Sequence, residues 1–279
     1  MDFSLGDEVW AFDCEWIPDV RAGRLVYGLP DDCPDDEVMR VMWKEGGATE
    51  ENPQPFLKTI YSRLVSIVAL IRRRCRDGQV KLFLQALPED PDDPAMDERY
   101  ILRRFLNEGV AVRNPQLVGF NSRNADLRIL LQRSFVNGLS EPELLKRMDR
   151  KPWENSDVDL MDTLAGFGRS YGCSLNDVAR LSGIPGKLDM TGYDVCRAWY
   201  GGRRGEVVEY NCFDSLTTYL VWLRLMFFAG RLSDDEHKLE QDRVREFLKS
   251  EIAKGKEFLQ TYLSAWDDLQ KRAAGHFPA

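Results

Sequence analysis

The sequence is poor in histidine. Of its 279 residues only two are histidines, His237 and His276, and both lie toward the C-terminal end. Histidine is the commonest metal ligand and the side chain that changes charge near neutral pH, so its scarcity argues against histidine-based metal or acid–base chemistry. The six cysteines include no C-x-x-C pair. This argues against a zinc site or a disulfide framework and favours reduced thiols of a cytosolic protein.

Long apolar runs are also lacking. No stretch of about 18 apolar residues is free of charge, so we expect no membrane span and no membrane partner. The first six residues lack the basic-then-apolar pattern of a signal peptide, and we therefore expect a cytoplasmic protein. With 43% hydrophobic residues, a chain of this length can bury a full core.

The negative charge of the chain is confined to one end. The net charge is −8, yet residues 1–55 hold 14 acidic and 4 basic residues, whereas the other 224 hold 32 and 34. A basic binding face outside the acidic segment remains open. Possible phosphate contacts, each with a solvated face as the alternative, are Arg72, Arg73 and Arg74, Lys146 and Arg147, Arg150 and Lys151, and Arg203 and Arg204.

The order of predicted elements favours a mixed α/β domain with a helical C-terminal half. We expect strands at residues 8–15, 63–71, 79–86 and 115–120, with Asp77-Gly78 as a hairpin turn. We expect helices at 97–107, from about 124, at 174–181, at 205–228 ending at Gly230, and at 233–273 with a break at Gly255. Residues 18–58 form either a flap or a solvated insertion, in which Asp35 caps a short helix.

The first strand carries two carboxylates. Because strand side chains alternate, Asp13 and Glu15 share one face while Phe12 and Cys14 point to the other. Like charges on a core strand repel, and burying them unpaired is unfavourable. A divalent cation over that face would neutralise them. The alternative is a strand end whose acids are solvated.

Two further acids occupy positions where they could join this pair. Asp126 begins the helix after the fourth strand, where the helix dipole favours an ionised carboxylate. Asp214 lies within the long apolar helix, one turn after Tyr210, so both side chains project from one face. The alternatives are a plain first-turn acid for Asp126 and an exposed helix edge for Asp214.

Three motifs resemble those of a known enzyme group. Phe12-Asp13-Cys14-Glu15-Trp16, the segment from Gly119 to Asp126, and Tyr210-Asn211-Cys212-Phe213-Asp214 resemble the three motifs of the DEDD group of RNase H-like 3′–5′ exonucleases. The third has the form of the tyrosine subclass, since Glu209 stands where the other subclass has histidine. Ala125 and Cys14 depart from the usual residues at their positions.

The chain is more similar still to predicted exonucleases related to the proofreading domain of family B DNA polymerases. Ile17-Pro18-Asp19, residues 157–162 and residues 183–187 also resemble that group, and the likeness covers about residues 8–232. It implies an RNase H-like mixed sheet of antiparallel hairpin strands plus a parallel strand, flanked by helices. We expect an exonuclease domain over residues 1–232, with the acidic insertion at 18–58, and a helical extension over 233–279.

The resemblance also implies the site residues. Two divalent ions, Mg²⁺ or Mn²⁺, would be held by Asp13, Glu15, Asp126 and Asp214, with Asp13 as the bridge and Tyr210 orienting the attacking water or helping to take its proton. Asn121 would lie near the scissile phosphate, Trp16 and Phe120 would stack on the terminal nucleotide, and Lys187 and Tyr193 would line the channel. A core role for Phe120 is the alternative.

The implied substrate is the 3′ end of single-stranded nucleic acid, with DNA favoured over RNA and nucleoside 5′-monophosphates as products. A replication or repair protein is an expected partner, and the oligomeric state is left open. Three alternatives remain at this stage. They are an exoribonuclease, a non-catalytic module that binds nucleic acid or a polymerase, and a regulatory protein acting through the acidic segment and the C-terminal helix.

Overall fold

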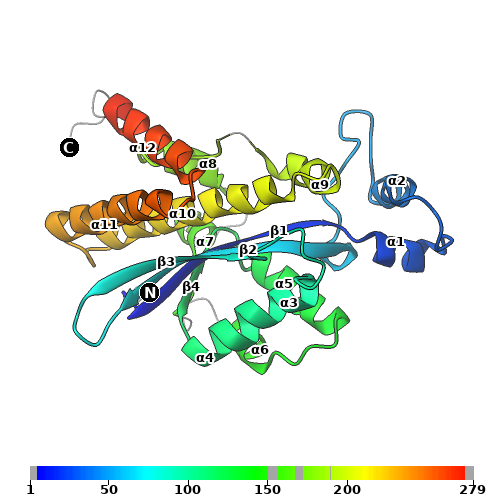
Figure 1. Cartoon of the computed structure of the whole chain (residues 1–279), viewed down its shortest axis with the longest axis horizontal. Coiled ribbons are helices and arrows are strands. Elements are labelled where there is room, and N and C mark those ends of the chain that lie inside the picture. Colours follow the sequence, from blue (N-terminus) through cyan, green and yellow to red (C-terminus); the bar gives the residue numbers. More distant parts are fainter. Residues whose placement is uncertain (1–4, 150–155, 167–171, 189, 274–279) are drawn as a thin grey trace.

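A five-stranded mixed sheet forms the centre of the protein (Figure 1). The computed structural model describes residues 5–149, 156–166, 172–188 and 190–273. The strands are β1 (Glu8–Pro18), β2 (Ser62–Arg74), β3 (Val80–Leu87), β4 (Gln116–Gly119) and β5 (Val158–Asp159), in the spatial order β3-β2-β1-β4-β5. β1, β2 and β3 pair antiparallel, whereas β4 and β5 run parallel to β1. The predicted mixed sheet is therefore confirmed.

The hairpin between β2 and β3 turns where the sequence indicates. Gly78 has a φ of +82°, a conformation that glycine adopts without strain. The Asp77 side chain accepts a hydrogen bond from the Gln79 N–H at 2.9 Å and closes the turn. β1 and β2 stay paired along their whole length, with one irregularity next to Glu15, where Val65 of β2 is the extra residue. A bulge of this kind re-aims the side chains beside it.

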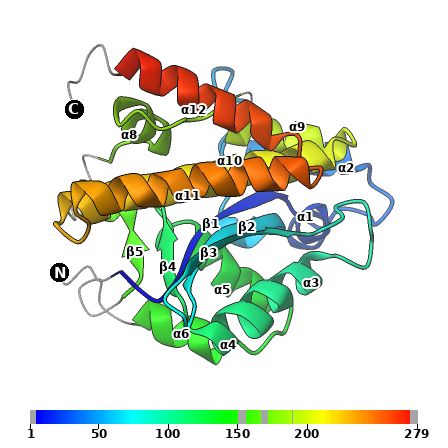
Figure 2. The same ribbon diagram turned by 60° about the vertical axis from the view of Figure 1, so that its left-hand side comes forward.

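Helices cover both faces of the sheet (Figures 1 and 2). One layer contains α3 (Glu98–Leu102), the π-helical η2 (Arg103–Val110), α4 (Ala111–Arg113), α5 (Asp126–Val136) and α6 (Pro142–Asp149). The opposite layer contains α8 (Leu175–Leu181), α9 (Gly192–Tyr200), α10 (Arg204–Phe228), α11 (Asp234–Ala253) and α12 (Leu259–Ala273). The short α7 (Leu160–Leu164) follows β5. None of the helices in the described ranges is both long and apolar enough to cross a membrane.

The alternation of β1 divides the core into two. Val9 and Ala11 join the cluster formed with α10, α11 and α12, while Trp10, Phe12 and Cys14 join the cluster on the α3 and α5 side. The expected opposite orientation of Phe12 and Cys14 is thus observed. α11 and α12 pack into the same cluster as the sheet, through side chains such as Leu248 and Trp266. The division of the chain at residue 232 stays a prediction about domain organisation.

The segment over residues 18–58 is more ordered than the sequence indicates. It contains two helices, α1 (Val20–Tyr27) and α2 (Asp35–Glu45), and leads through the 3₁₀ turn η1 (Thr59–Tyr61) into β2. α1 was not expected; Asp19 caps it by accepting from the N–H groups of Arg21 and Ala22. The expected cap at Asp35 is wrong, because Asp35 is the first helical residue and Pro34 precedes it without a side-chain cap.

Other elements differ from expectation in extent. The helix predicted at 97–107 continues to Arg113, and α6 and α9 were not expected. The helix predicted over 233–273 breaks into α11 and α12, with Gly255 at a φ of +101° between them. Gly230, with a φ of +66°, follows α10 as predicted. The Gly230 N–H donates to the Phe227 carbonyl, and the Arg231 N–H donates to the Met226 carbonyl.

Candidate active site

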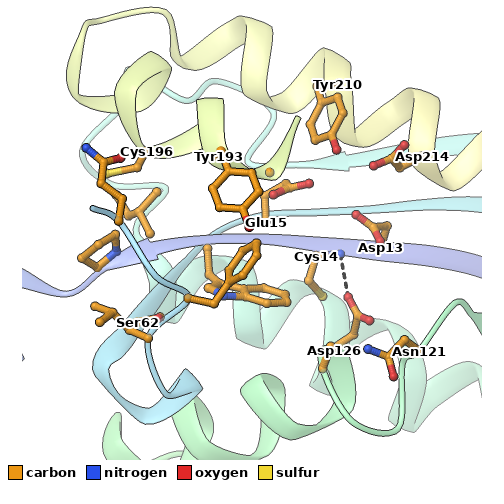
Figure 3. Close-up of a pocket in the computed structure, with 18 of the residues that line it drawn as sticks. Asp13, Cys14, Glu15, Ser62, Asn121, Asp126, Tyr193, Cys196, Tyr210 and Asp214 are labelled. Atoms are coloured by element: carbon orange, nitrogen blue, oxygen red, sulfur yellow. Dashed lines mark hydrogen bonds between the residues drawn. The ribbon is translucent and has the colours of Figure 1, made fainter. Parts of the chain in front are cut away.

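Strand β1 and helix α10 bring three carboxylates together. Asp13 and Glu15 project from β1 toward α10, and Tyr210 and Asp214 project from α10 back toward β1 (Figure 3). Asp13, Glu15 and Asp214 each offer an oxygen within 4.8 Å of the others. Asp214 is only 6% exposed, so the alternative of an exposed helix edge is wrong. Because their oxygens converge, these three carboxylates form a candidate site for a divalent metal ion.

Asp126 approaches from the other side of β1. β4 pairs with β1 only through Val9, Trp10 and Ala11, so the Cys14 N–H beyond that ladder can donate to a side chain. It donates to Asp126 Oδ1 at 3.0 Å, the bond drawn in Figure 3. Asp126 is the first residue of α5 and is 3% exposed. It lines the same pocket as the other three acids but is not within the 4.8 Å group.

A tight turn positions Asp126 at the start of α5. Asn121 has a φ of +61°, and Asp159 accepts hydrogen bonds from the Asn121 and Arg123 N–H groups at 3.0 and 2.9 Å. Gly119 allows this turn, because a Cβ there would lie 2.4 Å from the Cβ of Ser122. Asp159 therefore holds the loop that carries both Asn121 and Asp126, a role that its place in the motif at residues 157–162 does not reveal.

Asn211 is a site residue that sequence reasoning missed. It is fully buried beside Asp13. In the orientation that satisfies its whole amide, Nδ2 donates to Asp13 Oδ2 and to the Asp13 backbone oxygen, both at 3.2 Å, and Oδ1 accepts from Ser66 Oγ at 3.0 Å. Asn211 thus fixes the Asp13 carboxylate from α10. Its position inside the third motif was the available signal, but a buried partner on β2 is not visible in the sequence.

Burial raises the pKa of every acid in the site. The pKa of Asp13 and of Glu15 lies well above its ordinary value, because burial and the neighbouring acids both disfavour a further negative charge. Burial also raises the pKa of Asp214, against the opposing influence of Lys187 and Tyr210. The pKa of Asp126 rises to about 7, again through burial, although the backbone N–H bonds counteract it. A site that penalises its own charge in this way favours a bound cation.

Tyr210 faces the acids as a neutral phenol. Burial and then the Asp214 charge place the pKa of Tyr210 well above the ordinary value of a tyrosine. The ring is 4% exposed, and Lys187 Nζ lies 5.6 Å from its centroid. Lys187 is exposed on the loop before α9 and lowers the pKa of the three clustered acids. The phenol is therefore suited to hold a water molecule by hydrogen bonds rather than to take its proton.

The predicted substrate-contacting side chains lie around one pocket of about 370 Å³. Trp16, Phe120, Asn121, Lys187 and Tyr193 all line it, together with the four acids and Tyr210. Trp16 and Phe120 are also packed at the edges of the two core clusters. The 18–58 segment also lines this pocket, through side chains that include Trp43, Gln54, Phe56 and Leu57. That segment therefore contributes directly to the site.

Most of the basic runs considered for phosphate binding lie elsewhere. Arg72 is 1% exposed and bonds Glu240 of α11 at 2.7 Å, so it is a core ion pair. Arg73 bonds Glu8, Arg147 bonds Asp157 and Lys146 bonds Glu143. Arg203 and Arg204 bond Glu206 and Asp92. Arg74 is exposed at the end of β2, and Arg150 and Lys151 fall outside the described residues. None of the described ones lines the pocket of the acids.

The fold and the site together define a nuclease-type domain, with acidic side chains gathered around the central strand of a mixed sheet. Residues 54–266 match the sequence family described as "Predicted 3'-5' exonuclease related to the exonuclease domain of PolB". The chain belongs to this family. The matched residues include Asp126, Tyr210 and Asp214 but begin after Asp13 and Glu15, so the position of these two acids beside Asp214 is a separate structural observation.

Comparison with solved structures finds the family B DNA polymerase from the hyperthermophilic archaeon Pyrobaculum calidifontis. The sequences are 17% identical, the TM-score is 0.46, and the similarity covers 79% of this chain and 24% of the polymerase. This chain thus corresponds to less than two thirds of the length of that protein. No curated protein matches the sequence.

Proposed function

We propose that this chain is a metal-dependent 3′–5′ exonuclease that removes nucleoside 5′-monophosphates from the 3′ end of single-stranded nucleic acid. DNA is the favoured substrate, because the family is related to the exonuclease domain of a DNA polymerase. The observation that carries the proposal is the convergence of Asp13, Glu15 and Asp214 within 4.8 Å. These acids come from two elements about 200 residues apart in the sequence, and they meet in a pocket large enough for a ligand.

The residues present fit divalent cations. Carboxylate oxygens are the ligands that Mg²⁺ and Mn²⁺ prefer. The raised pKa values of Asp13 and Glu15, caused by burial and by neighbouring acids, support a site that gains from added positive charge. Asp13, Glu15 and Asp214 would hold one ion, and Asp126 with Asp13 would hold a second. Bound ions would polarise the scissile phosphate and stabilise the negative charge that develops on its oxygens.

Side chains of this chain would position the attacking water, the phosphate and the Asp13 carboxylate. Tyr210, kept neutral by its surroundings, would orient the attacking water at the phosphorus atom. Water adds to phosphorus and releases one proton to solvent, the bond from phosphorus to the 3′ oxygen breaks, and that oxygen takes up a proton from solvent as it leaves. Asn121 and Lys187, at the rim of the pocket, would contact the phosphate, and Asn211 would keep the Asp13 carboxylate in place.

The test is digestion of 5′-labelled single strands of DNA and RNA of one sequence. We expect a descending ladder that requires Mg²⁺ or Mn²⁺ and stops with chelator, faster on DNA than on RNA. Strands ending in a 3′ phosphate and closed circles should resist. Cleavage of circles at a comparable rate would show an endonuclease, and strand binding without any hydrolysis would show a non-catalytic module.

A further inference from the structure

Helix α12 of the C-terminal extension packs against the part of α10 that carries Asp214. It lies on the side of α10 away from the sheet (Figures 1 and 2). The ring of Phe213, the residue before Asp214, contacts the rings of Phe258 and Tyr262, with centroids 5.9 and 5.7 Å away. Tyr262 is fully buried. The extension therefore contacts the third motif of the site directly.

Two hydroxyl groups connect α12 to the loop between α8 and α9. Thr217, one turn after Asp214 on α10, donates its hydroxyl hydrogen to the Pro185 carbonyl at 2.9 Å. The hydroxyl oxygens of Tyr262 and Thr217 are 3.0 Å apart. Because a threonine hydroxyl has one hydrogen and Pro185 accepts it, Tyr262 must be the donor of the second bond. The order of donation therefore runs from Tyr262 through Thr217 to Pro185.

The same loop carries Lys187 and is anchored on both sides of Gly186. The Lys187 N–H donates to Asn176 Oδ1 of α8 at 3.0 Å, and the Pro185 carbonyl is held by Thr217. Glycine is needed between these anchors, because a Cβ on Gly186 would lie 2.3 Å from Asn176 Oδ1. Gly186 is buried whereas Lys187 is exposed. A fixed backbone thus presents a side chain that lines the pocket of the acids.

The Thr217 hydroxyl has a competing partner within its own helix. A threonine inside a helix can donate to the carbonyl four residues earlier, which in α10 is that of Phe213. The hydrogen bond that Thr217 accepts from Tyr262 stabilises the rotamer in which its hydroxyl reaches Pro185 instead. Lysine has a flexible four-carbon stem, so the position of its ammonium group depends on how firmly the backbone beneath it is held.

We propose that Tyr262 is a positioning residue for Lys187. Its hydroxyl keeps Thr217 on the Pro185 carbonyl, and the anchored loop then holds the Lys187 ammonium group beside the acids, 5.6 Å from the centre of the Tyr210 ring. The inference rests on the proposed function, in which Lys187 contacts the phosphate. It gives the C-terminal extension a part in catalysis, through a loop that belongs to the opposite side of α10.

The first test uses two variants that each remove one hydroxyl. Tyr262→Phe keeps the ring against Phe213, and Thr217→Val keeps the shape of the side chain. The kcat/KM on a thymidine hexanucleotide should fall about fivefold in Tyr262→Phe and about tenfold in Thr217→Val. In a Lys187→Ala background the same substitutions should cost less than about twofold, because residues that act through one group are not additive. An equal loss in both backgrounds, or wild-type activity in Lys187→Ala alone, would overturn the proposal.

A second measurement does not depend on activity. Trypsin cleaves after an exposed lysine once the backbone around it opens, so the cleavage rate after Lys187 in metal-free protein reports how firmly the loop is held. This rate should rise about fivefold in Tyr262→Phe, while cleavage after Arg74, exposed at the end of β2, should not change. Tyr219→Phe removes another buried hydroxyl of α10, one that donates to Glu240. It is the matched control and should behave as the wild type in both tests.

The two measurements separate this inference from the exonuclease proposal. An unchanged cleavage rate after Lys187 in both Tyr262→Phe and Thr217→Val would overturn the positioning role, even in an active exonuclease. An inactive wild type whose loop is cleaved faster in the two variants would contradict the exonuclease function and would support the connection between Tyr262 and the loop.

Discussion

The four acids of the site fall into two unlike groups. Asp13, Glu15 and Asp214 face one another on the α10 side of β1, and each increases the difficulty of charging the next. Asp126 lies on the other side of β1 and is already bonded to the Cys14 N–H. The first group is held together by the packing of α10 against β1. Asp126 is held by the Cys14 N–H, which can donate to it because β4 pairs with β1 only as far as Ala11.

This difference indicates separate roles for the two groups. Three mutually repelling carboxylates gain most from a cation, so they should provide the stronger metal site. Asp126 has one oxygen engaged by a backbone donor, which already offsets part of its charge. It should therefore contribute more to turnover than to the binding of the first ion.

The largest expected effect follows from removing one member of the cluster. Asp214→Ala should lower exonuclease activity by about 10³-fold or more, because a bound ion supplies several kcal/mol of charge stabilisation. It should also remove the rise in melting temperature that Mn²⁺ causes in the wild type. Asp126→Asn should lose turnover but keep that rise, since the amide oxygen can still accept from Cys14. Asp242→Ala, on the exposed face of α11, is the matched control. Loss of the Mn²⁺ response in Asp126→Asn alone would reverse the proposed division.

The next effect concerns the hydroxyl that stands beside the cluster. Tyr210→Phe keeps the ring and its packing and removes only the group aimed at Asp214. Turnover should fall by roughly 10²- to 10⁴-fold, while the Mn²⁺-induced rise in melting temperature and the KM should hardly change. Tyr100→Phe, which removes an exposed hydroxyl bonded to Glu89, should leave turnover intact. Wild-type turnover in Tyr210→Phe would show that the ring serves only packing.

A smaller effect should follow from the amide that fixes Asp13. Asn211→Ala removes the donors at 3.2 Å from the Asp13 carboxylate and main chain. Hydrogen bonds to charged groups contribute about 1.5–3 kcal/mol, so activity should fall at least about tenfold, with a higher Mn²⁺ concentration needed for half-maximal rate. Asn211→Asp should lower activity further than Asn211→Ala, because it adds a like charge beside Asp13. Unchanged metal dependence in Asn211→Ala would mean that the amide has only a structural role.

The sequence revealed the cluster because its signals are local. The D-x-E spacing on a strand, and a tyrosine and an aspartate one turn apart on an apolar helix, each follow from the period of a single element. The contacts that complete the site are not local. Cys14 bonds Asp126, Asn211 bonds both Asp13 and Ser66, and Phe56 meets Tyr193. These pairs depend on where β4 ends and on how the 18–58 segment folds back. The periodicity of single elements does not predict either feature.

The missed helix α1 shows why propensity was insufficient. Gly23 lies in its middle, and glycine lowers helix propensity by about 1 kcal/mol. The glycine is needed there because Val38 and Met42 of α2 occupy the space of a side chain. The basic run Arg72, Arg73 and Arg74 is a similar case. Strand alternation turns Arg72 toward the core, where its partner is Glu240, 168 residues later.

The smallest predicted effect is a dependence of metal-free stability on pH. An acid whose pKa is raised by folding stays protonated when the unfolded chain would ionise, so stability is greatest at low pH and falls as pH rises toward the folded pKa. The window runs from about pH 4, the ordinary carboxyl value, up to about 7, the pKa of Asp126. In chelator, the melting temperature should therefore fall by about 5 °C between pH 5 and pH 7. Asp214→Asn should show a smaller fall, because it removes one repelling charge from the cluster, and Asp242→Asn should behave as the wild type. A melting temperature that is flat over this range would mean that folding does not raise the pKa values of these acids.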